Sequence, residues 1–535
     1  MLSYRKLAMR VLGHPLHTGG IDSPRPASQR AAAFILTAAM LTTLAAPAFA
    51  DIWHIENGDI TISAGESGNN VTQNNNTTYG DTNTIITNQN KDKASSHTVT
   101  IETNDKNDKV EVTLKDVNID TSSRNKAAVS VTGSGNTTIK LDGDNALKSD
   151  IYRSGIYGSG SLTISGGEND SLTAQGGSGA NGISSSGSLT ISGGTVTANG
   201  DDGGRGISSS GSVTISGGST VTANGGSGTI SGGDGIWSGG GVTISGGSTV
   251  TANGGNGGSL VGGDGIRSGG GLTVSDGTVT AKGGNGDSKD GYGGDGIRSG
   301  GVVTISGNTV NAAGGYGGKV GGYGICSFDR VAISGGTVEA AGGNGSTGGG
   351  SGIYSSVIDL SGSLELTAKA GSPSGRALSQ KGSELVLDTI KDKLGPGAKV
   401  TATDADGKVI DQVSTPRPVE PEESSSSSDG GSAAPSAPAS PLPGLTVTDK
   451  DGQRISYTST QSGNTLTVCV GRFTASFRIS LAALRQLRAE GIETITFQTI
   501  LCSTTLSVDE LLAMGGEDAE AVLTHRFTDS SLTVG

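Results

Sequence analysis

The sequence predicts a mainly β protein: a right-handed parallel β-helix, then a linker and a small α+β domain. Glycine is frequent, at 94 of 535 residues, whereas aromatic residues make up only 3%, so a core must use small side chains. A Gly-Ile pair recurs roughly every 28 residues through the middle of the chain, which is a period typical of solenoids. Each repeat holds three short β-branched runs separated by glycines, which predicts three strands per coil.

Residues 1–50 have the pattern of an export signal. Basic residues precede an apolar run at 31–46, and Ala48-Phe49-Ala50 forms a small-residue cleavage site, which predicts a mature chain that starts at Asp51. The alternative is an uncleaved membrane anchor, but the apolar run is short for a span. We expect no transmembrane segment after cleavage, and a secreted protein that is either free or associated with the cell surface.

The repeats form the predicted β-helix at 51–410. The unit at 233–255 reads GDGIWSGGGVTISGGSTVTANGG, and Val242 and Ile244 alternate with Thr243, so both apolar side chains face one side. We expect each coil to bury about five such residues, as with Ile236, Val242, Ile244, Val250 and Ala252. The recurring isoleucines are Ile156, Ile183, Ile207, Ile236, Ile266, Ile297, Ile325 and Ile353.

The flanking segments differ in composition from the repeats. Residues 51–105 are polar and rich in Asn, and we expect an N-terminal cap and first coils there, because an open solenoid end exposes unpaired edges. Residues 411–443 are rich in Pro, Ser, Ala and Glu, which is typical of a solvated linker. Residues 444–535 predict a small α+β domain of unknown role, with helices at Leu481–Ala489 and Val508–Met514.

Charge and cysteine content narrow the classes of partner. The net charge of −13 and the pI of about 4.9 argue against nucleic-acid binding, which needs a basic surface. An acidic glycan would need local cations or metal ions. Of the three cysteines, Cys326 lies in the repeats, and Cys469 and Cys502 either form a disulfide or remain buried thiols.

No catalytic residue is predicted. The mature chain has three scattered histidines without metal-ligand spacing, and its Gly-rich runs lack the G-K-[ST] ending of a phosphate loop. The many serines are expected in turns and on the surface. Loop acids could bind calcium through oxygen ligands, with Asp234, Asp264 and Asp295 as the candidates, although solvated turn residues are the simpler interpretation.

A ladder of side chains predicts a binding face. The residue after each repeat isoleucine should face outward and stack from coil to coil. Exposed Trp and Tyr are platforms for sugar rings, and Arg forks onto carboxylates or hydroxyls. An ordinary exposed ladder is the alternative. The candidate ligand-binding residues are Tyr157, Trp237, Arg267, Arg298 and Tyr354, and Ser184, Ser208 and Cys326 occupy the other positions.

The early repeats resemble a known family. The stretch from VEVTLKDVNID (110–120) through GNTTIKLDGDNALKS (135–149) to GSLTISGG (160–167) is similar to secreted carbohydrate-binding β-helix proteins of clostridia and related gut bacteria. The resemblance covers roughly residues 55–400. It implies a non-catalytic, pectate-lyase-like β-helix that binds polysaccharide, including acidic plant glycans, with calcium in the fold. It assigns no ligand-binding residue.

Three function classes remain open. The first is a non-catalytic polysaccharide-binding or adhesive surface protein that recognises a plant or host glycan. The second is a structural stalk or protein adhesin that displays the C-terminal domain. The third is a calcium-dependent polysaccharide lyase with a lysine base, for which Lys282, Lys289 and Lys319 are the candidates in the repeats. We expect a protein that is not an enzyme.

Overall fold

The computed structural model describes residues 51–416 and, with short gaps, residues 444–534. The predicted export signal at 1–50, the predicted linker beyond residue 416 and Cys502 lie outside the described residues. The chain divides into two compact units, a solenoid and a C-terminal unit.

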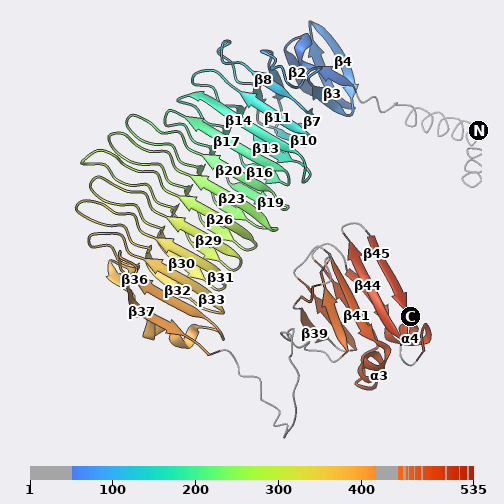
Figure 1. Ribbon diagram of the computed structural model, residues 1–535. Coiled ribbons are helices and arrows are strands. Elements are labelled where there is room, and N and C mark those ends of the chain that lie inside the picture. Colours follow the sequence, from blue (N-terminus) through green and yellow to red (C-terminus); the bar gives the residue numbers. More distant parts are fainter. Residues whose placement is uncertain are drawn as a thin grey trace, which may run out of the picture. The chain divides into compact units, whose positions relative to one another are not determined.

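The first unit is a β-solenoid of about 13 turns, and its coils carry three short parallel strands each (Figure 1). One coil consists of β21 (Ile236–Ser238), β22 (Val242–Ile244) and β23 (Ser248–Asn253). The next consists of β24 (Ile266–Ser268), β25 (Leu272–Val274) and β26 (Gly277–Lys282). Ile236 pairs with Ile266, and Val250 pairs with Val279. This register confirms the predicted repeat and its three strands per coil.

The remaining strands extend the same three columns. The first column also holds β2 (Ile60–Gly65), β6 (Val99–Thr103), β9 (Val129–Gly133), β12 (Ile156–Gly158), β15 (Ile183–Ser185), β18 (Ile207–Ser209), β27 (Ile297–Ser299) and β34 (Leu378–Gln380). The second also holds β1 (Ile52–His54), β5 (Thr84–Thr87), β7 (Lys109–Lys115), β10 (Asn136–Asp142), β13 (Ser161–Ser165), β16 (Leu189–Ser192), β19 (Val213–Ser216) and β28 (Val303–Ile305). The long strands β30 (Ile325–Ile333) and β32 (Ile353–Leu360) pass through both columns.

The third column is a twelve-stranded sheet. Besides β23 and β26 it holds β8 (Asn118–Asp120), β11 (Asp144–Lys148), β14 (Ser171–Ser178), β17 (Thr195–Asp201), β20 (Thr220–Asn224), β29 (Thr309–Ala313), β31 (Gly336–Ala341), β33 (Leu364–Lys369), β36 (Lys399–Thr403) and β37 (Val409–Ser414). The strand β37 runs into the segment for which the sequence predicts the linker, because it pairs antiparallel with β36 at the edge of this sheet.

The core is built from one small apolar residue at each inward position. Ile236, Val242, Ile244, Val250 and Ala252 are all buried, as the alternation predicts. Each coil therefore removes several modest side chains from water, at about 25 cal/mol per Å² of apolar surface. Stacking repeats this gain in every coil, and the fold needs few aromatic residues.

A column of buried serines was not predicted. From Ile183 onward, the residue two positions after each repeat isoleucine is a serine that faces inward at the corner before the second strand, and the Ser238 Oγ donates to the carbonyl of Gly211 at 2.8 Å. The expectation that serines lie in turns and on the surface is wrong for this column, because each hydroxyl satisfies a carbonyl of the preceding coil. Its members are Ser185, Ser209, Ser238, Ser268, Ser299, Ser327 and Ser355.

Beyond the third strand, two columns of glycine pack against each other and form what we call the glycine neck. The amide of Gly233 donates to Gly226 at 2.8 Å, and the amide of Gly255 donates to Gly233 at 2.8 Å. The same alternation continues through Gly263, Gly284, Gly294, Gly315, Gly322, Gly343, Gly350 and Gly371. A Cβ on Gly263 would lie 1.9 Å from the carbonyl oxygen of Gly233, so a side chain has no room in the neck.

Antiparallel pairs lie at both ends of the solenoid. Near the N-terminal end, β3 (Gly68–Gln73) pairs antiparallel with β2 and with β4 (Asn76–Asp81), and η1 covers Ile55–Asn57. Near the other end, β35 (Ser383–Glu384) turns back on β34, and the 3-10 helix η2 (Leu387–Lys393) buries Leu387 and Ile390. These elements turn the strand direction and interrupt the parallel edges.

The C-terminal unit contains two four-stranded sheets and two helices in its described part. One sheet holds β38 (Leu445–Thr448), β41 (Ala475–Ser480), β44 (Glu520–Arg526) and β45 (Asp529–Val534), and the other holds β39 (Thr458–Ser462), β40 (Thr465–Cys469), β42 (Thr494–Gln498) and β43 (Ser503–Ser507). Helix α3 covers Leu481–Ala489, and α4 covers Val508–Ala513. The Oγ of Ser480 accepts from the Ala483 amide at 3.2 Å and caps α3. Among the described residues, no helix is long and apolar enough to cross a membrane.

Candidate functional site

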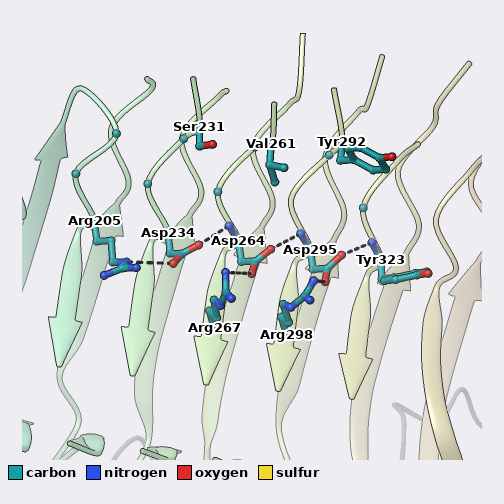
Figure 2. Close-up of a pocket in the computed structure, with 18 of the residues that line it drawn as sticks. Arg205, Ser231, Asp234, Val261, Asp264, Arg267, Tyr292, Asp295, Arg298 and Tyr323 are labelled. Atoms are coloured by element: carbon teal, nitrogen blue, oxygen red, sulfur yellow. Dashed lines mark hydrogen bonds and ion pairs between the residues drawn. The ribbon is translucent and has the colours of Figure 1, made fainter. Parts of the chain in front are cut away.

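A groove runs along the solenoid beside the start of the first strand column; we call it the solenoid groove. It encloses about 860 Å³ and is lined by residues from successive coils, from Gly179 to Tyr323. Glycines such as Gly233 and Gly263 line it next to the neck. Figure 2 shows the carboxylates of Asp234, Asp264 and Asp295 in a row that continues to Arg205, with the loops above them and Arg267 and Arg298 on the strands below.

The carboxylates of Asp234, Asp264 and Asp295 form what we call the carboxylate column. Each aspartate occupies the second position of a G-D-G-I run, where the chain turns into the first strand. The Oδ1 of each accepts the backbone amide of the equivalent residue in the next coil, at 2.9 Å from Asp264, 2.7 Å from Asp295 and 2.7 Å from Tyr323. The column therefore joins consecutive coils as well as lining the groove.

An arginine faces each carboxylate. Nε of Arg205 lies 3.2 Å from Oδ2 of Asp234, and an Nη of Arg298 lies 3.3 Å from Oδ2 of Asp295. Arg267 approaches Asp264 at 3.9 Å. Arg267 and Arg298 follow their aspartates by three residues, so the turn into the first strand brings each pair together. The groove consequently presents donors and acceptors side by side.

Burial raises the pKa values of two aspartates in the carboxylate column. The pKa of Asp264 is raised well above its usual range by burial and by the charges of Asp295 and Asp234. Burial raises the pKa of Asp295 to about 6, although the Tyr323 amide and Arg298 oppose the shift. The paired Arg298 has its own pKa raised, since the nearby carboxylates favour its charge over the cost of burial.

Aromatic side chains near the groove are partly covered by neighbours. The guanidinium of Arg205 lies 4.4 Å from the ring centre of Trp237, so one face of this predicted sugar platform is occupied. Tyr354 stacks on Tyr323 with ring centres 4.9 Å apart. Tyr292 is half exposed on the groove wall, with the Lys319 ammonium 5.5 Å from its ring centre.

The predicted ladder exists in register. Tyr157 aligns with Ser184, Trp237 with Arg267, Arg267 with Arg298, and Cys326 with Tyr354. Its outward exposure is uneven: Tyr157 is 42% exposed, whereas Cys326 is 1% exposed and Ser208 is also buried. The expectation that all eight residues face solvent is therefore wrong at these two positions, where a small side chain lies next to a larger one of the column, Trp237 beside Ser208 and Tyr354 beside Cys326. Burial raises the pKa of the Cys326 thiol to about 12, so it stays protonated.

The sequence-predicted site residues fall into separate places. Arg267, Arg298 and the three aspartates line the solenoid groove, whereas Trp237 contacts it through Arg205 and Tyr354 through Tyr323. Tyr157 lines an adjoining groove of about 680 Å³, together with Lys126, Tyr152 and Arg153. The two grooves share Gly179 and Asn181.

Sequence reasoning missed the parallel bridges that build one wall of the groove. The loops beyond the glycine neck form their own parallel bridges, from Ser231 to Val261, from Val261 to Tyr292 and from Tyr292 to Val320. These residues line the groove opposite the arginines (Figure 2). Arg205 was missed as well, although it occupies the G-X-G-I position of the aspartates, and a comparison of that position between repeats could have found it.

The arrangement of the described residues gives no support to the calcium and lyase hypotheses. Among the described residues, no group of three or more His, Cys, Asp or Glu side chains is arranged to hold a metal ion. The Oδ1 atoms of the carboxylate column already accept backbone amides, and the Oδ2 atoms face arginines. Of the three candidate lysines, Lys282 and Lys289 are absent from the groove lining, and Lys319 lies over Tyr292. The calcium site and the lysine base remain predictions.

The solenoid groove thus has an ordered polar wall. Its features are a column of buried carboxylates, a matching set of arginines and a loop wall that includes Tyr292. Comparison of the whole chain with protein-family models, with curated proteins and with solved structures finds no match.

Proposed function

We propose that this protein is a secreted or cell-surface, non-catalytic protein that binds a polysaccharide chain along the solenoid groove. The supporting observation is that one groove receives side chains from successive coils, at a coil spacing of about 4.8 Å. A ligand that fills it must be long and narrow. A polysaccharide in extended conformation has this form, and its hydroxyls pair with donors and acceptors that alternate along the groove wall.

The polar wall suits sugar hydroxyls. Each Arg–Asp pair places a forked donor on the groove wall, and the carboxylate of the pair helps to hold the guanidinium in place. Tyr292 adds a half-exposed ring on the opposite wall, and aromatic faces pack against sugar rings. Because the wall is fixed by the coil register, little ordering is needed on binding.

The test is binding of the chain from Asp51 to Gly535 to an array of plant and host glycans, with and without calcium. We expect selective binding that Arg267→Ala and Tyr292→Ala weaken about tenfold each, since a charge-assisted hydrogen bond or a ring contact contributes about 1.4 kcal/mol. Lys282→Ala is the matched control, because this exposed cation belongs to the same coil but lies on the third strand, away from the groove.

Other outcomes point to the other functions. Binding that survives both groove variants would place the site elsewhere on the protein. Release of an unsaturated oligosaccharide would favour the lyase, and Lys319→Ala should then abolish it. The absence of binding to every glycan would favour a stalk or protein adhesin.

A further inference from the structure

The charged groups around the groove are closely matched in number. Three arginines face three carboxylates, so the local charge is balanced while all the carboxylates are ionised. Tyr323 and Cys326 are the other titratable groups against this wall, and Lys319 lies across the groove over Tyr292. The facing groups are Arg205 before β18, Asp234 before β21, Asp264 and Arg267 at β24, Asp295 and Arg298 at β27, and Tyr323 and Cys326 at β30.

The two oxygens of each carboxylate have different partners. Oδ1 accepts a backbone amide of the next coil, which cannot accept a proton in return. Oδ2 faces the arginine, at 3.3 Å in the Asp295 pair and at 3.9 Å in the Asp264 pair. The guanidinium has no acceptor either, so neither oxygen has a partner that accepts a hydrogen bond from a bound proton. A proton taken up at Oδ2 lies beside the arginine and removes the charge that the arginine faces, while the inter-coil hydrogen bond to Oδ1 remains.

Protonation at Oδ2 changes what the groove offers to a ligand. With the column ionised, the charge of each arginine is already balanced, and a ligand carboxylate would approach three buried anions. With the column protonated, Arg267 and Arg298 keep their charge and lose their counter-charge. They can then pair with carboxylates of a bound chain.

We propose that the carboxylate column sets the charge class of the bound glycan: the ionised column selects uncharged chains, and the protonated column admits carboxylated chains. This inference rests on the proposed function, because it concerns the same groove. It makes the site responsive to mild acid rather than to calcium.

The raised pKa of Asp295 places the expected change in glycan selectivity near pH 6. The pKa of Asp295 is raised to about 6 and that of Asp264 is also raised, mainly because both are buried. As the pH falls through about 6, Asp295 takes up a proton, and burial favours the protonated form of Asp264 as well. The carboxylates of a uronic-acid chain resemble free carboxyl groups, so they are still ionised at pH 5.

The experiment uses two forms of one oligosaccharide, an oligogalacturonate and its methyl-esterified form. The two forms differ in charge but have the same sugar backbone. Binding of both to the Asp51–Gly535 protein is measured by calorimetry at about pH 7.5 and about pH 5. We expect the esterified chain to bind similarly at both pH values. The free acid should gain about tenfold or more in affinity at the lower pH, which corresponds to about 1.4 kcal/mol.

The variant Asp264→Asn/Asp295→Asn tests the assignment to the column. It should bind the free acid at pH 7.5 as the original protein does at pH 5, because Asn keeps an oxygen acceptor for the inter-coil amide but carries no charge. Asp290→Asn, an exposed loop acid outside the groove lining, is the control and should leave the pH dependence unchanged. The pH comparison on the original protein stands even if the double variant fails to fold.

Each outcome decides the inference. Equal binding of both chains at pH 7.5, or a double variant with unchanged preference, overturns it while the groove remains a glycan site. The protein can also bind neither oligogalacturonate form in calorimetry while it binds other glycans of the array through the groove. That result overturns the inference and leaves the proposed function intact. No binding to any glycan overturns both.

Discussion

Asp264 and Asp295 lie between backbone amides and arginines, and their burial makes their charge costly. Both have a pKa above that of an exposed aspartate. The native state therefore holds more protons than the unfolded chain between the unfolded pKa, near 3.9, and the native value near 6 of Asp295. The contribution of these groups to stability is complete at low pH and is lost as the pH rises through the native pKa.

We therefore expect the solenoid to become more stable, relative to Asp264→Asn/Asp295→Asn, as the pH falls from about 7 to about 5. The difference should be on the order of 2 kcal/mol, since each pKa unit corresponds to about 1.4 kcal/mol. Urea unfolding of both proteins at several pH values measures it. If the two proteins have parallel pH profiles, Asp264 and Asp295 do not have the raised pKa values.

At the residue scale, the sequence predicts the candidate aspartates but not the ion pairs that they form. The three aspartates were recognisable as candidates, but their pairing with Arg205, Arg267 and Arg298 depends on how the chain turns before each first strand. Cys326 was expected to face outward from strand alternation, and the size of its neighbours in the column determines its burial instead. Single-residue exposure on a ladder is a property of neighbouring coils.

At the scale of elements, the strands were predictable and the glycine neck was not. Strand alternation in Val242-Thr243-Ile244 determines which residues are buried, and Leu481–Ala489 has both the helical periodicity and the serine cap of α3. The paired glycines read only as turn signals in the sequence. Their close packing follows from two loop arms meeting, which no local pattern indicates.

A substitution in the neck should be costly. Gly263→Ala places a Cβ 1.9 Å from the Gly233 carbonyl oxygen, and the three atoms nearest to it all belong to the backbone, which cannot move aside as a flexible side chain would. We expect a loss of about 2 to 4 kcal/mol, because overpacking and broken hydrogen bonds act together. Gly348→Ala is the matched control, since its nearest neighbour is the Val320 side chain at 3.8 Å. Urea unfolding followed by circular dichroism compares the two, and equal losses would contradict the close packing of the neck.

At the scale of the whole molecule, stability in the solenoid is distributed over about 13 similar turns. Each coil contacts its neighbours through parallel ladders and through the inter-coil hydrogen bonds of the serine and carboxylate columns. In such an array the free energy is close to a sum of coil and interface terms. The repeat length could be counted in the sequence, whereas the antiparallel pairs at the two ends could only be expected as caps of unspecified form.

Removal of one complete coil should leave a folded protein. Deleting residues 236–265 joins Gly235 to Ile266 and restores a Gly-Ile pair in register with Ile207. We expect a cooperative transition with the urea m-value lowered by about one part in 13, because the surface exposed on unfolding scales with coil number.

Deletion of 236–250 is the contrasting variant, since it removes part of a coil and shifts the strands out of register. It should fail to give the β-sheet circular dichroism spectrum. A stable product from this second deletion would show that register does not determine the fold.

The glycine neck separates the strands of each repeat from its loop, and these two parts are under different structural constraints. On its inner side the strands must keep their spacing, while on its outer side the loops range from 227–231 in one coil to 285–292 in another. Neck hydrogen bonds between glycine backbones hold the arms together whatever loop they carry. New recognition surfaces can therefore arise by exchange of the loops alone. The ligand that is bound can then change while the residues of the core stay the same.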